Sequence, residues 1–60
     1  MSQSDFIAAL EQELRLRGVE FARAELVAFV DDVWPLAEEN PDPVSWAREF
    51  IDSGRGSMRA

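Results

Sequence analysis

Hydrophobic residues in the first part of the chain recur every three or four positions, which is the spacing of one face of a helix. This first stripe consists of Phe6, Ile7, Leu10 and Leu14. Ser2 to Asp5 has the spacing of a capping box, and Ser4 is a second possible N-cap. Gly18 suits the left-handed position at which a helix ends. The pattern predicts a helix over residues 4–17, approximately.

Charged residues on the opposite face of this predicted helix also fit helical spacing. Glu11 precedes Arg15 by four positions, and Glu13 precedes Arg17 by four. Such acid-first pairs stabilise a helix by about 0.2–0.5 kcal/mol each. We therefore expect two ion pairs along the solvent-facing side of this helix.

A second helical pattern has an apolar arc that is broader than a surface helix requires. The arc consists of Leu26, Phe29, Val30, Val33 and Ala37, with Val27, Trp34 and Leu36 along its edges. Phe21 is placed for a hydrophobic staple around an N-cap at Ala22, where Ser, Thr, Asp or Asn is more usual. Pro35 lacks an amide donor and clashes with the preceding turn. The pattern predicts a central helix over residues 22–39, with a break or a kink at Pro35.

The third helical pattern has the clearest start. Asn40 and Pro41 end the second helix, Asp42 is a favoured N-cap, and Pro43 fits the first helical position. The apolar stripe that follows consists of Trp46, Ala47, Phe50 and Ile51, with Val44 at its margin. Gly54 is a plausible terminator.

These three patterns predict an all-α fold, a small three-helix bundle. The third helix is expected over residues 43–53, so a single helical domain would occupy residues 1–53. Residues 54–60 have no periodicity and are expected to form a flexible C-terminal tail. No strand-like alternation of useful length is present in the sequence.

The composition removes several classes of site. The chain has 60 residues, with no cysteine and no histidine. Cysteine-based zinc sites are therefore excluded, as are the commonest metal ligand and the usual general base near neutral pH. The sequence also lacks a glycine-rich phosphate loop, and three short helices leave no room for a deep pocket. We expect no enzymatic activity, no cofactor and no metal.

Charge and hydropathy narrow the possible partners and location. The net charge is −6 and the basic residues are scattered arginines, which argues against a nucleic acid or an anionic membrane as partner. The sequence shows neither a signal-peptide pattern nor an apolar run of membrane-spanning length. We expect a soluble cytoplasmic protein.

Acidic residues recur along the second predicted helix. Glu25, Asp32 and Glu39 are seven residues apart and share a face, with Asp31 and Glu38 beside them. Clustered carboxylates bind divalent cations in some proteins, but no calcium-loop motif is present in this chain. A solvated face, or one that meets a basic partner, is the favoured interpretation.

The two tryptophans leave two interpretations open. Trp34 and Trp46 bracket the connection between the second and third helices. They could form an interaction hot spot, because tryptophan is enriched in such sites. Alternatively, they close the open end of the bundle and pack against each other, which is the favoured interpretation because both lie on or beside apolar stripes.

The chain has more large apolar residues than three short helices need for a core. We therefore expect burial against a second copy or against a larger partner. The candidate interface residues are Leu16, Val27, Trp34, Leu36 and Trp46. The sequence favours a non-enzymatic protein-interaction module that forms homo-oligomers or binds a larger protein through the apolar flank of the second helix. The alternative is an acidic regulator that masks a basic, nucleic-acid-binding protein.

Overall fold

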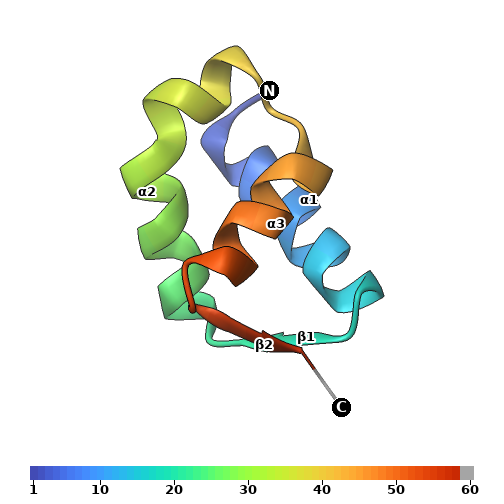
Figure 1. The fold of residues 1–60 in the computed structure, drawn as a ribbon. Helices are drawn as coiled ribbons and strands as arrows, with labels where there is room; N and C mark the ends of the chain where they lie inside the picture. Colours follow the sequence, from blue (N-terminus) through green and yellow to red (C-terminus); the bar gives the residue numbers. More distant parts are fainter. Residues whose placement is uncertain (59–60) are drawn as a thin grey trace.

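The computed structural model describes residues 1–58 and contains three helices and one small sheet in that range (Figure 1). The elements in chain order are α1 (Gln3–Leu16), β1 (Val19–Phe21), α2 (Arg23–Glu39), α3 (Pro43–Asp52) and β2 (Gly56–Met58). The predicted all-α architecture of a small three-helix bundle is confirmed.

The boundaries of α1 follow its capping residues. Ser2 is the N-cap, and its Oγ accepts a hydrogen bond from the amide of Asp5 at 3.1 Å. At the other end Gly18 has a φ of 73°, the left-handed conformation predicted for it. Both predicted ion pairs on the outer face of α1 are present, at 3.3 Å for Glu11 with Arg15 and 3.1 Å for Glu13 with Arg17.

Helix α2 begins after Ala22, as predicted, and this N-cap makes no side-chain hydrogen bond to the first turn. The helix runs through Pro35 without interruption, so of the two predicted alternatives a break does not occur. Because proline has no N–H, the carbonyl of Asp31 receives no amide from position 35.

Helix α3 is capped by Asp42. One carboxylate oxygen of Asp42 accepts from the amide of Val44 at 3.1 Å, and the other accepts from Ser45 Oγ at 2.9 Å. Pro43 occupies the first turn, where its missing N–H has no cost. Gly54, with a φ of 82°, terminates the helix as predicted.

The segment after α3 differs from the prediction. Residues 56–58 do not continue as a structureless tail but form β2, which pairs antiparallel with β1. The register places Val19 opposite Met58, Glu20 opposite Ser57 and Phe21 opposite Gly56. The predicted flexible tail over residues 54–60 is thus wrong for β2, while its last two residues, 59–60, lie outside the described residues.

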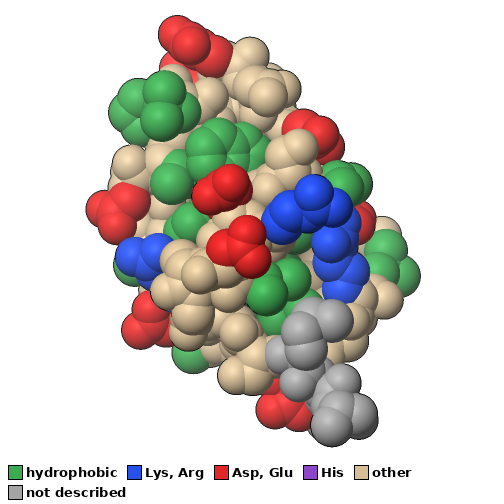
Figure 2. Space-filling model, in the orientation of Figure 1, with side chains coloured by type: hydrophobic (Ala, Val, Ile, Leu, Met, Phe, Trp, Pro, Cys, Tyr) green, Lys and Arg blue, Asp and Glu red, His purple; other side chains and the backbone are tan. Residues whose placement is uncertain are grey.

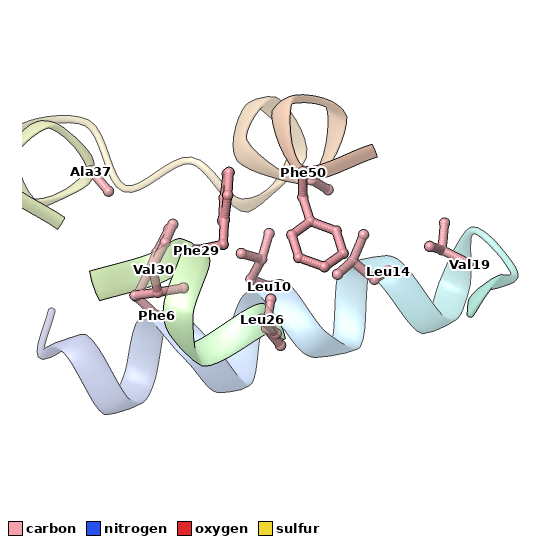
Figure 3. Packing of buried hydrophobic residues seen from close by; sticks show 10 residues of the cluster. Phe6, Leu10, Leu14, Val19, Leu26, Phe29, Val30, Ala37 and Phe50 are labelled. Atoms are coloured by element: carbon pink, nitrogen blue, oxygen red, sulfur yellow. The ribbon is translucent and has the colours of Figure 1, made fainter. Parts of the chain in front are cut away.

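The core lies where the three helices and β1 meet. In Figure 3, side chains from α1, α2 and α3 point toward one another, with Phe50 of α3 directed toward Leu10 and Leu14 of α1. The fully or almost fully buried side chains are Phe6, Leu10, Leu14, Val19, Leu26, Phe29, Val30, Ala37, Ala47 and Phe50. Each lies on an apolar stripe predicted from the sequence, except Val19, which comes from the strand.

Helices α1 and α2 run antiparallel. The side-chain amide of Gln3, at the start of α1, donates to Asp31 at the middle of α2. Arg23, the first residue of α2, forms an ion pair of 3.1 Å with Glu11, which lies further along α1. The N-terminus therefore lies at the same end of the bundle as the connection between α2 and α3, and the sheet lies at the opposite end (Figure 1).

Candidate functional site

The connection between α2 and α3, with the residues that flank it, is the part of the chain that the sequence singles out. We call residues 34–46 the α2–α3 corner. The two tryptophans of this corner pack on different partners: the ring of Trp34 lies 5.6 Å from that of Phe6, and the ring of Trp46 lies 6.4 Å from that of Phe29. Each tryptophan thus covers one side of the core.

The predicted packing of the two tryptophans against each other is not found among residues 1–58, whose ring contacts do not include a Trp34–Trp46 pair. Instead, the indole N–H of Trp46 donates to the backbone carbonyl of Asn40 at 2.8 Å. This bond holds the first turn of α3 against the end of α2. Both tryptophans are half-buried and support the corner from inside.

Leu36 is the candidate interface residue that the corner leaves most open. Its side chain is 66% exposed, and Val44, across the connection in α3, is 46% exposed. The sequence pattern did not single out Val44 as an interface residue. Leu16 is 75% exposed, but it ends α1, which at that point lies beside the start of α2 rather than its end. Val27 is half-buried along α2.

The five predicted interface residues therefore do not form one continuous surface. Leu36 faces outward at the corner, Trp34 and Trp46 contact core phenylalanines, and Leu16 lies toward the sheet. On the face shown in Figure 2, hydrophobic side chains form separate patches between acidic and other groups. Any partner that contacts Leu36 at the corner cannot contact Leu16 through the same small patch.

The acidic residues of α2 divide into two groups by their contacts. Glu25 and Asp32 lie 3.9 Å and 3.8 Å from the guanidinium of Arg55, and Asp31 accepts from Gln3. Within residues 1–58, Glu38 and Glu39 have no ion pair and no side-chain hydrogen bond. The unpaired carboxylates are therefore those of the last turn of α2, inside the corner.

Arg55 is a structural residue that the sequence did not reveal. It follows α3 and places its guanidinium carbon 5.4 Å from the centre of the Phe29 ring, between two carboxylates of α2. Cation–π contact and ion pairing both hold the segment before β2 against α2. An arginine beside Gly54 gave no periodic signal, because its partners lie more than twenty positions earlier in the sequence.

The described part of the chain offers no enclosed site for a small ligand. The Cα atoms span 33 × 18 × 16 Å, and no pocket is present in the surface formed by residues 1–58. Over the same range no three His, Cys, Asp or Glu side chains are grouped to hold a metal ion. None of the helices in residues 1–58 is long and apolar enough to span a membrane.

At the α2–α3 corner an exposed leucine is flanked by carboxylates along the helix. Asp32 precedes Leu36 by four residues and Glu39 follows it by three, and residues at these spacings are neighbours on a helix surface. We call Asp32, Leu36 and Glu39 the Leu36 surface.

Comparison of the chain with models of protein families, with curated proteins and with solved structures finds no match.

Proposed function

We propose that this protein is a non-enzymatic protein-interaction module that binds its partner through the Leu36 surface of α2. The observation that carries the proposal is the exposure of Leu36, 66%, on a helix whose other large apolar side chains are buried or half-buried. Burial of such a side chain contributes about 1.5–3 kcal/mol. Because Leu36 is 66% exposed, a partner that covers it would gain at most about two-thirds of that contribution.

The rigidity of the corner supports the proposal. Asp42 caps α3, Trp46 bonds to Asn40, and Trp34 packs on Phe6, so the backbone on either side of Leu36 is fixed by contacts with the rest of the bundle. A surface held in this way loses little conformational entropy when it binds.

Two partners were open from the sequence, a second copy of the chain and a larger protein. Self-association through Leu36 would bring two identical acidic surfaces together, since an isologous contact pairs the same patch on both copies. Like charges across an interface disfavour it. The proposal is therefore a larger partner at the Leu36 surface, with homo-oligomerisation as the competing outcome.

The alternative function, an acidic regulator that masks a basic nucleic-acid-binding protein, has the net charge of −6 in its favour. A regulator of this kind needs an extended row of free carboxylates that imitates the phosphates of a nucleic acid. Glu25, Asp31 and Asp32 instead contact Arg55 or Gln3 within the chain. These internal contacts favour a compact docking surface over an extended phosphate mimic.

Photo-crosslinking tests the proposal. The photoreactive residue benzoyl-phenylalanine is placed at Leu36 in one variant and at Leu16 in another, and each is expressed in the native cells. Both leucines are exposed and neither belongs to the buried core, so both variants are expected to fold. The expected result is an adduct with another protein at position 36 and none at position 16.

Other outcomes have distinct meanings. An adduct of twice the chain's own mass at position 36 would show self-association instead of a larger partner. An adduct at position 16 alone would place the interface at the sheet end of the bundle. The absence of any adduct at position 36, with folding verified by circular dichroism, would refute the proposed binding surface.

A further inference from the structure

The last turn of α2 carries its charges in an unfavourable order. Glu38 and Glu39 occupy that turn, and it contains no basic residue. The carbonyl groups at the end of a helix create a partial negative charge, which disfavours acidic side chains and favours basic ones. Neither glutamate is compensated by an ion pair or side-chain hydrogen bond within residues 1–58.

The first helix carries its charges in the favourable order. Asp5 lies in the first turn of α1 and Arg15 in its last turn, which matches the helix dipole at both ends. Helix α3 likewise ends without a basic residue and carries Glu49 and Asp52 in its last turn, so what distinguishes the end of α2 is the exposed Leu36 one turn before Glu39. Departures from local charge rules are expected where a surface serves binding rather than stability.

One of the two unfavourable charges, that of Glu39, lies directly beside the exposed leucine. Glu39 is one turn beyond Leu36 on the same side of α2, and Asp32 is one turn before it. At the corner end of the view in Figure 2, a hydrophobic patch lies close to acidic side chains. An apolar group flanked by carboxylates is complementary to an apolar group flanked by cations.

Resting on the proposed function, we infer that the partner presents a basic segment, with arginine or lysine beside an apolar side chain, to the Leu36 surface. The apolar side chain would cover Leu36, and the cations would lie against Glu39 and the terminal carbonyl groups of α2. A cation at that position interacts favourably with both the carboxylates and the helix dipole. A second copy of this chain would bring further negative charge instead.

A peptide titration followed by NMR tests this inference on the whole isotope-labelled chain. Three synthetic peptides of equal length share the same leucine positions and carry arginine, glutamine or glutamate at the others. The expected result is binding of the arginine peptide, with amide shifts concentrated in residues 33–44 and lost in Leu36→Ser. Leu16→Ser is the matched control, and its binding should equal that of the unmodified chain.

A charge-matched pair of variants separates specific docking from general attraction to an acidic protein. Glu38→Gln with Glu39→Gln removes the unpaired charges of α2, whereas Glu49→Gln with Asp52→Asn removes the same amount of charge from α3. The first variant should weaken arginine-peptide binding by at least about threefold and the second should change it much less. The α2 variant should also raise the melting temperature of the free chain, because it relieves the unfavourable charges.

The possible results distinguish the inference from the function on which it rests. The glutamine or glutamate peptide could bind as tightly as the arginine peptide, with binding that still depends on Leu36. That result would overturn the inference of a basic partner and leave the proposed binding surface intact. If both charge variants weakened binding of the arginine peptide equally, the cause would be the net charge of the chain and not the position of the carboxylates. This result would also overturn the inference. Failure of every peptide to show Leu36-dependent binding would count against both the basic partner and the Leu36 surface.

Discussion

The guanidinium carbon of Arg55 lies 5.4 Å from the centre of the Phe29 ring, and this contact joins the segment after α3 to the middle of α2. A cation over an aromatic face contributes about 0.5–1 kcal/mol at an exposed site. The ion pairs of Arg55 with Glu25 and Asp32 are 3.9 Å and 3.8 Å long and involve exposed carboxylates, so they add little. The ring contact is the larger stabilising interaction.

Arg55→Ala should therefore lower the free energy of unfolding by about 1 kcal/mol, measured by urea denaturation. Arg48→Ala is the matched control, because Arg48 is exposed on α3 and forms no ion pair or ring contact within residues 1–58. Arg55→Lys should recover only part of the loss, since an ammonium group lacks the planar face of the guanidinium. Equal stability of the two alanine variants would contradict the role given to the ring contact.

Gly56 allows β2 to approach the core closely. A Cβ at this position would lie 2.8 Å from Val19 Cγ1 and 2.9 Å from Phe50 Cε2, and both of these side chains are buried. Gly56→Ala should lower the free energy of unfolding by about 1–3 kcal/mol, since overpacking forces neighbours off their preferred positions.

The control for Gly56→Ala is Ser57→Ala, in the same strand but exposed, which should change the stability by less than about 0.5 kcal/mol. Thermal and urea denaturation of both variants provide the comparison. If Gly56→Ala were as stable as the unmodified chain, β2 would not be packed against Val19 and Phe50 as the structure has it.

The contrast between the helices and the sheet explains how far the sequence could predict this fold. Caps such as Ser2 and Asp42 and the periodic apolar stripes are local features, readable within a few residues. The pairing of Val19 with Met58 joins segments at opposite ends of the chain, and strands of three residues are too short to show alternation.

The candidate site was predictable to a similar degree. Helical spacing identified Leu36 as an edge residue, and the structure leaves it exposed. Spacing also placed Trp34 and Trp46 beside the core, but it could not say which helix each ring would meet. The choice of Phe6 and Phe29 as their partners depends on the antiparallel packing of α1 and the position of α3. Tertiary packing, unlike capping, has no signature within a single segment.

The N-cap of α2 is a position where stability can be gained. Ala22 has the extended backbone of an N-cap, with φ −87° and ψ 133°, and provides no side-chain acceptor for the first turn. Ala22→Ser should raise the free energy of unfolding by about 1 kcal/mol, because the serine hydroxyl would accept a hydrogen bond from the amide of Ala24 or Glu25. Differential scanning calorimetry would detect the higher melting temperature.

Ala28→Ser is the control for the cap, because Ala28 is exposed in the interior of the same helix. Serine there should destabilise the helix slightly relative to alanine. A rise in melting temperature for Ala22→Ser together with a fall for Ala28→Ser would identify capping as the cause. A lower melting temperature for Ala22→Ser would mean that the amide groups in the first turn of α2 already have other hydrogen-bond acceptors.

The indole hydrogen bond of Trp46 fixes the corner next to the Leu36 surface. Its N–H donates to the carbonyl of Asn40 at 2.8 Å, so Trp46→Phe removes a bond as well as part of a ring. Trp34→Phe removes the same atoms, but the indole of Trp34 donates no hydrogen bond within residues 1–58. The difference in free energy of unfolding between the two variants therefore measures the contribution of this hydrogen bond. We expect about 0.5–1.5 kcal/mol, determined by urea denaturation.

Amide hydrogen exchange should show where the effect of Trp46→Phe acts. Loss of the bond leaves the carbonyl of Asn40 with the amide of Asp42 as its remaining donor and loosens the contact between the end of α2 and the first turn of α3. Exchange should accelerate at the amides of Asn40 and Trp46, whose backbone bonds close the neighbouring turns. The amides around Glu11, far from the corner on α1, should be unaffected. Uniform acceleration throughout the chain would instead mean that Trp46 stabilises the bundle as a whole and not the corner in particular.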